Sequence, residues 1–152
     1  MRAVRLGRLL LVLGAVVALG CGKPSPPLIR GALKTETSVN PDVRGRPSPV
    51  VVRIYELKAV TAFNAADFFT LFDREAEALG GDLIGREEYF MRPGENRPYQ
   101  RQLQPDTKFI GVAAAFRDLE NARWKQVAPV PPKKEPTVTI DVDGAGITVA
   151  IK

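Results

Sequence analysis

Cys21 is the only cysteine among the 152 residues and the side chain best suited to covalent chemistry. It follows a leader with three arginines, an uncharged apolar run over residues 9–19, and small residues at Ala18 and Gly20. This layout is typical of a secretory signal with its cleavage site. A cysteine directly after the cut is typical of the lipoprotein pathway, which attaches a diacylglycerol to the sulfur. We therefore predict that residues 1–20 are removed as a signal peptide and that Cys21 carries a covalent lipid.

Two further features concern the same segment. As a helix, residues 9–19 would rise about 16 Å, too little to cross a hydrocarbon core of about 30 Å. The recognition sequence for lipoprotein processing, the lipobox, favours Leu three residues before the cysteine, where this chain has Ala18. Two alternatives therefore remain: ordinary signal cleavage that leaves Cys21 as a free thiol, or a cysteine that is there by coincidence. Gly22 is not the Asp that retains many lipoproteins in the inner membrane. We expect an outer-membrane protein that faces the periplasm and is held by its lipid chains.

Catalytic and ligand-binding residues are hard to find in the remainder. The sequence has no histidine, which excludes Ser-His-Asp triads, Cys-His pairs and histidine-based zinc sites. Carboxylate catalysis by Asp82, Glu87 and Glu88 stays open, but neighbouring residues of a strand point to opposite faces. A glycan-binding protein would need an aromatic platform, and Trp124 is the only tryptophan. We predict no catalytic residue, no metal, no other cofactor and no small-molecule substrate.

The charge is close to balanced in the predicted mature chain. The full sequence has 22 Lys+Arg and 17 Asp+Glu, a net charge of +5. Three of the arginines lie in the leader, so 19 basic residues face 17 acidic ones after its removal. This balance gives no support to nucleic-acid binding.

The segments after Cys21 predict a short tether and one β domain. Residues 21–27 are proline-rich and should form an extended spacer, and residues 28–152 form the domain. Short apolar runs bounded by turn residues are typical of strands in a two-sheet antiparallel sandwich. We expect strands over residues 28–39, 50–57, 87–91, 96–103, 109–116, 124–127, 138–142 and 147–151.

One helix is predicted between the second and third strands, over residues 64–79. Its apolar residues follow a helical spacing, Asn64 is the expected cap, and Gly80 ends it. Phe63 is expected to pack against Phe68 at its start. Such an aromatic face indicates core packing against a sheet.

Residues 40–49 form the most distinctive loop. They contain three prolines and a glycine, so neither a strand nor a helix can run through them. A loop stiffened in this way loses little entropy on binding and could be a pre-shaped recognition surface, or it could be an ordinary connection. The second proline-rich loop, residues 129–136, has no assigned role.

Four segments in order resemble the type VI secretion lipoprotein family, often called TssJ or VasD: RPSPVVVRIYELK (46–58), FNAADFFTLFDREAEALGGDL (63–83), MRPGENR (91–97) and FIGVAAAFRDLENARWK (109–125). The resemblance implies a transthyretin-like two-sheet β-sandwich of seven to eight antiparallel strands with an inserted helix. It also implies a non-enzymatic, lipid-anchored outer-membrane subunit of the secretion membrane complex. The implied partner is the periplasmic C-terminal region of the inner-membrane component TssM.

In this family the loop between the first two strands is a main partner contact. The resemblance therefore gives the loop at residues 40–49 a binding role that its composition alone leaves open. By position, the implied partner-binding residues are Asn40, Pro41, Asp42, Val43, Arg44, Gly45 and Arg46.

Overall fold

A computed structural model describes residues 25–152. Its elements, in chain order, are β1 (Leu28–Thr35), β2 (Val50–Leu57), α1 (Thr61–Ala65), α2 (Phe68–Asp73), α3 (Glu75–Leu79), the 3-10 turn η1 (Gly80–Asp82), β3 (Leu83–Met91), β4 (Asn96–Gln102), β5 (Phe109–Ala114), β6 (Lys125–Pro129), β7 (Thr137–Val142) and β8 (Ile147–Ile151). The predicted signal peptide and Cys21 lie outside the described residues.

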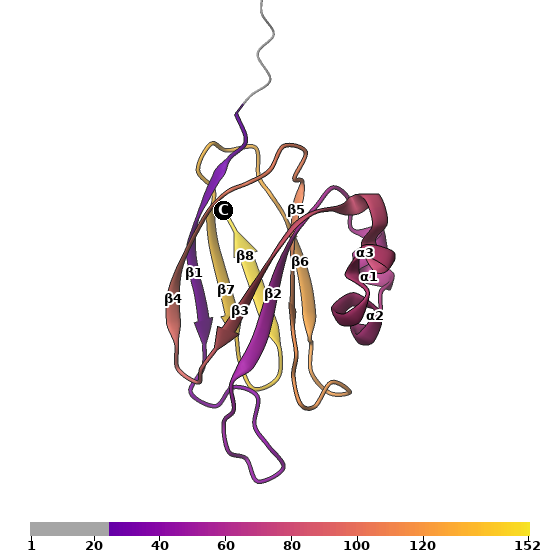
Figure 1. The fold of residues 1–152 in the computed structure, drawn as a ribbon. Coiled ribbons are helices and arrows are strands. Elements are labelled where there is room, and N and C mark those ends of the chain that lie inside the picture. The colour runs from indigo at the N-terminus through magenta and orange to yellow at the C-terminus, as the bar shows by residue number, and fades with distance from the viewer. Residues whose placement is uncertain (1–24) are drawn as a thin grey trace, which may run out of the picture.

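The eight strands form two four-stranded sheets, in the orders β4-β1-β7-β8 and β3-β2-β5-β6, which pack as a sandwich (Figure 1). This confirms the predicted two-sheet β-sandwich. The expectation of antiparallel pairing throughout is wrong for one pair, because β1 and β7 run parallel. The parallel pair brings the backbones together at Gly31, where an added Cβ would lie 1.6 Å from the Val138 carbonyl oxygen. Only glycine fits this strand position.

Alternation along β2 divides the apolar side chains between two clusters. Val52 and Ile54 join the main core between the sheets, where they pack with residues such as Ile140. Tyr55 and Leu57 belong to a second cluster beneath the helices. The strand is central in its sheet and buried on both faces in its second half, which agrees with its continuous apolar sequence.

The single helix expected over residues 64–79 is wrong, because the segment forms three short helices. Ala66 has an extended backbone (φ −63°, ψ 135°), and Arg74 leaves the helical region again (φ −138°, ψ 48°). Asp67, not Asn64, is the capping residue, since its carboxylate accepts a hydrogen bond from the Thr70 N–H. A strong local cap restarts the helix and overrides the apolar periodicity.

The helices are fastened to the outer face of the β2–β5 sheet by apolar contacts and by two cations. Phe63 packs edge-to-face against Tyr55, with ring centres 5.7 Å apart, and not against Phe68 as expected. The Lys125 ammonium donates to the carbonyls of Phe63, Asn64 and Ala66 at 2.6–2.9 Å, which are left open at the end of α1. Burial lowers the pKa of Lys125. Arg53 donates likewise to the Phe72 carbonyl at 2.6 Å.

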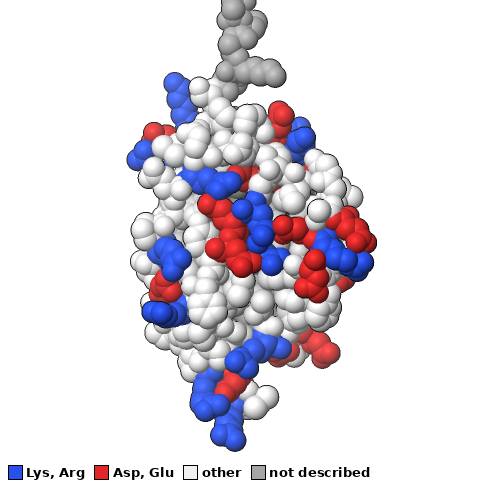
Figure 2. All heavy atoms as spheres, viewed as in Figure 1, with Lys and Arg blue, Asp and Glu red and all other residues white. Residues whose placement is uncertain are grey.

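The strand boundaries differ most from expectation at the end of β1 and the start of β3, and by one or two residues in β4, β5, β6 and β7. β1 ends at Thr35, four residues before the predicted end, although Val39 is still buried as the apolar alternation indicated. β3 begins at Leu83, where the strand pairs with the end of β2 across a register shift. Gly85 lies inside the strand, and a glycine there reads in the sequence as part of a connection. Further along β3, Arg86 pairs with Glu75 at 2.9 Å. Figure 2 shows acidic and basic side chains gathered in the middle of the visible face.

The tether enters the fold at one end, and the loop between β1 and β2 projects from the other (Figure 1). The Pro27 carbonyl accepts a hydrogen bond from the Leu103 N–H at 3.0 Å, and the Leu28 N–H donates to the Lys134 carbonyl at 2.8 Å. These bonds fix the chain just before β1. Within residues 25–152 no helix is long and apolar enough to cross a membrane.

Candidate functional site

The loop between β1 and β2 is closed at its base and open at its tip. The Ser48 N–H donates to the Val39 carbonyl at 3.1 Å, and both residues are buried. Beyond this closure the chain extends past the ends of the sheets, at the lower end of Figure 1. The base therefore belongs to the core, and the tip is presented to solvent.

Asn40 shapes the loop from inside. Its backbone is left-handed (φ 50°), and only 4% of the residue is exposed. Its side-chain NH₂ donates to the Pro49 carbonyl at 2.7 Å, and its side-chain oxygen accepts from the Arg117 N–H at 2.8 Å. Asn40 thus joins the two ends of the loop to the segment after β5. Its side chain is therefore turned into the fold and is not exposed at the tip.

Asp42 organises the tip. Its carboxylate accepts from the N–H groups of Arg44 at 2.9 Å and Arg46 at 3.0 Å, and from Arg46 Nε at 2.8 Å. These hydrogen bonds, those of Arg46 first, hold the pKa of Asp42 below its usual value. Gly45 takes a positive φ of 75° to complete the turn. The tip is therefore a defined structure, with a carboxylate at its centre.

The outward surface of the tip combines apolar and basic groups. Val43 is fully exposed, at 104% of its reference area, and Pro41, Arg44 and Arg46 are exposed as well. Basic groups gather at this projecting end in Figure 2. An exposed aliphatic side chain flanked by guanidinium groups suits a protein partner with an apolar pocket and carboxylates near it.

A groove of about 620 Å³ runs beside the loop. Pro41, Asp42 and Val43 form one wall, and Phe116, Arg117, Asp118 and Gly144 come from two other connections. This second wall was not predicted from the sequence. Its residues lie over seventy positions away in the chain, so only the fold could bring them beside the loop.

Three of the residues considered for other chemistry, Glu87, Glu88 and Trp124, have partners within the fold. Glu88 is paired with Arg53 at 2.6 Å, and Glu87 is paired with Arg101 at 2.7 Å. Trp124 packs edge-to-face on Phe68, with ring centres 5.4 Å apart. Among residues 25–152, no group of three or more His, Cys, Asp or Glu side chains could hold a metal ion.

Comparison with known proteins decides the family. Residues 28–145 match the family model described as type VI secretion lipoprotein, VasD, EvfM, TssJ, VC_A0113. The chain belongs to the type VI secretion lipoprotein family. This is a family of structural, membrane-bound lipoproteins and not a known enzyme family. A comparison with curated protein sequences gives no significant match.

Solved structures agree with this family and with the fold. The lipoprotein TssJ1 from Pseudomonas aeruginosa is 37% identical, with a TM-score of 0.80 over 84% of this chain and 97% of that one. Lip from Serratia marcescens, described as a membrane-bound component of the type VI secretion system, shares the fold at 23% identity, with a TM-score of 0.76 over 82% and 98% of the two chains. A chain in a structure described as a type VI membrane complex is 30% identical, with a TM-score of 0.70 over 82% and 98%.

Proposed function

We propose that this protein is an outer-membrane lipoprotein subunit of the type VI secretion membrane complex, anchored by lipid on Cys21. Its proposed partner is the periplasmic C-terminal region of the inner-membrane component TssM, and the contact is the loop at residues 40–46. The observation that carries the proposal is the placement of this loop. It projects from the end of the sandwich opposite the tether (Figure 1). A protein anchored at one end thereby presents its shaped, basic tip away from its own membrane.

Relatives in solved structures support the choice of partner. One is the chain in the structure described as a type VI membrane complex. Another is a chain in a structure described as the T6SS protein TssM C-terminal domain (869–1107) from EAEC. That chain is 29% identical to this one, with a TM-score of 0.66, and the match covers 81% of this chain and 97% of that one.

Within the proposed site, the residues divide by role. Val43, Arg44 and Arg46 offer side chains to the partner, since they are exposed at the tip. Asp42 and Asn40 hold the loop in shape through their internal hydrogen bonds. A loop ordered before binding loses less entropy in the complex, which strengthens binding without further contacts. The proposed function is non-enzymatic.

The test is binding of residues 22–152 to the C-terminal periplasmic region of the cognate TssM, measured by calorimetry. We expect micromolar or tighter binding, weakened at least about tenfold by Val43→Asp because it places a charge at the centre of the contact. Phe69→Asp is the matched control, since Phe69 is also a large, exposed apolar residue (66%) but lies on α2. Equal losses in both variants would reject the loop as the site.

A variant with residues 40–49 replaced by glycine and serine extends this test. Binding that survives the replacement would keep the partner and move the interface elsewhere. Absence of any binding by the wild-type domain, with binding of peptidoglycan or glycans instead, would replace the proposal with a cell-wall-binding function.

The anchor has a separate test. In cells, Cys21→Ser should move the protein from the membrane fraction to the soluble periplasm and abolish incorporation of labelled fatty acid. A membrane-bound Cys21→Ser protein would show that lipid on this thiol is not the anchor.

A further inference from the structure

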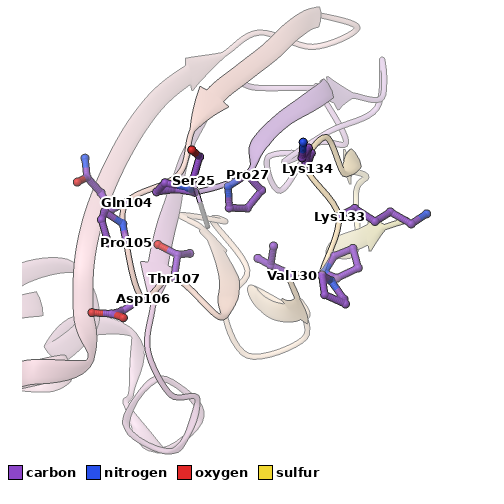
Figure 3. Close-up of a pocket in the computed structure, with 12 residues that line it drawn as sticks. Ser25, Pro27, Gln104, Pro105, Asp106, Thr107, Val130, Lys133 and Lys134 are labelled. Carbon is purple, nitrogen blue, oxygen red and sulfur yellow. The ribbon is translucent and has the colours of Figure 1, made fainter. Parts of the chain in front are cut away.

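The end of the sandwich that receives the tether contains a groove of about 900 Å³ (Figure 3). The tether residues Ser25 and Pro27 lie between two loops, residues 104–107 on one side and 130–134 on the other. The lining is rich in proline: Pro26, Pro27, Pro105, Pro131 and Pro132. Proline rings have no N–H to leave unpaired, so this end is apolar and stiff.

The distance between this groove and the proposed lipid is short. The carbonyls of Pro26 and Pro27 accept hydrogen bonds from the side chain of Gln102 and the N–H of Leu103. Only residues 21–25 separate this attachment from the lipid-bearing position. At about 3.1 Å per residue for extended, proline-rich chain, they span about 16 Å. The groove is therefore held within about two Debye lengths of the headgroup layer.

The rim of the groove carries the charge that such a surface would attract. Lys133 and Lys134 are exposed and line the groove, and neither forms an ion pair within residues 25–152. Asp106 is the one acidic residue of the lining. The neighbouring Glu135 lies 4.0 Å from Arg30, which offsets its charge. The groove lining is thus basic by one charge, and it faces the side on which the proposed lipid anchor lies.

We propose that this end of the domain docks on anionic phospholipid headgroups, with Lys133 and Lys134 on the phosphates and the proline-lined groove at the headgroup layer. The proposal rests on the lipid anchor of the proposed function and adds a second, non-covalent membrane contact. The tether length favours lipid over a protein occupant, because little space is left between the groove and the bilayer. Each lysine beside an anionic leaflet strengthens the association about fivefold, so the pair contributes about twenty-five-fold.

Docking would fix the tilt of the domain. The five tether residues before this attachment would by themselves allow the sandwich to swing, and the loop at residues 40–46 would then sweep a wide arc. A second contact at the same end holds the long axis of the sandwich upright and keeps the loop far from its own membrane.

The test couples residues 21–152, which contain both sheets and both cores, through Cys21 to a maleimide lipid in vesicles. Chemical coupling replaces natural lipidation, so the result does not depend on processing in cells or on TssM. In a Trp124→Phe background, a reporter tryptophan is placed at the groove (Pro132→Trp) or at the distal tip (Val43→Trp). Quenching by headgroup nitroxide lipid is measured in phosphatidylcholine vesicles with and without phosphatidylglycerol.

We expect the groove reporter to be strongly quenched only when the vesicles contain phosphatidylglycerol. The tip reporter should be quenched little in either kind of vesicle. The double variant Lys133→Glu, Lys134→Glu should abolish the dependence of groove quenching on phosphatidylglycerol. The control is the double variant Arg44→Glu, Arg117→Glu, which makes the same charge change at the other end and should preserve that dependence. Equal groove quenching with and without phosphatidylglycerol would show that the tether alone sets the distance and would overturn the proposal. Stronger quenching at the tip would overturn the orientation as well.

Discussion

Glu56 is the buried charge on which the tether end of the fold depends. It is 2% exposed, at the end of β2, and its carboxylate accepts hydrogen bonds from Arg101, from the Gln104 N–H at 2.7 Å and from the Thr107 hydroxyl at 2.7 Å. It therefore ties β2 to β4 and to one wall of the groove. We predict that removing this carboxylate destabilises the domain more than any exposed ion pair can.

The burial of Glu56 sets how much its removal should lower the free energy of unfolding. Removing one partner of a buried ion pair costs about 3 to 5 kcal/mol, because the other charge stays buried without compensation. Arg101 is partly exposed and keeps Glu87 at 2.7 Å, so Glu56→Ala should lie near the lower end, about 3 kcal/mol. Glu56→Gln retains the size and one acceptor and should cost about 1 to 3 kcal/mol. Replacing both charges, by Glu56→Leu with Arg101→Met, should cost less than the two single changes added together.

Urea unfolding followed by Trp124 fluorescence measures these free energies. The control is Arg97→Met, which removes the partly exposed pair between Arg97 and Glu95 and should lower the free energy of unfolding by about 1 kcal/mol or less. Hydrogen exchange gives a second readout, since the amides of residues 104–107 should exchange faster in Glu56→Ala. If Glu56→Ala unfolds at the same urea concentration as Arg97→Met, the reasoning from burial is refuted.

Three more predictions test the helices, the sheet and the loop. Leu71→Ala should lower the free energy of unfolding, measured in urea, by about 3 kcal/mol because the Leu71 side chain is fully buried beneath α2. The control is Phe69→Ala, because Phe69 is 66% exposed. Equal losses in the two variants would contradict this packing. Gly31→Ala should prevent folding, as measured by circular dichroism, because the added Cβ would collide with the facing carbonyl of β7. The control is Gly81→Ala, because a Cβ at Gly81 would lie in open space. A Gly31→Ala protein that folds would disprove the close approach of the two strands. Asp42 has a pKa below its usual 3.8, so the stabilisation it gives the loop is complete above pH 3.8 and is lost as the pH falls through the lower folded value. Backbone amide shifts of the loop should report a midpoint below 3.8, and a midpoint at or above it would contradict the hydrogen bonds of this carboxylate.

The strands were predictable where the sequence is locally consistent. β2 has the predicted bounds, residues 50–57, because its β-branched run begins directly after Pro49 and ends before Lys58. The helical segment was not predictable from periodicity. Its apolar spacing is real, but Asp67 supplies a stronger local signal, and the chain satisfies both by breaking into short helices that still bury Phe63, Leu71 and Leu79.

The loop at residues 40–49 was predictable in position, but the placement of its side chains was not. Proline density marked these residues as a stiff loop, and the family resemblance predicts a binding role for it. The inward orientation of Asn40 depends on the Arg117 N–H, 77 residues further along the chain. No local pattern encodes such a contact. The same holds for Glu56, whose partners Gln104 and Thr107 follow it by about fifty residues.

Strand β1 is the only element between the tether and the loop, and this gives the domain its polarity. Its eight residues span about 26 Å at 3.3 Å each. Both edges of β1 are paired, with β4 on one side and β7 on the other, so the strand cannot bend or slip without breaking two ladders. The separation of the two ends is therefore rigid, and only the tether can change the height of the loop above the membrane. Lengthening the tether should consequently weaken docking at Lys133 and Lys134, while leaving the affinity of the isolated domain for its partner unchanged.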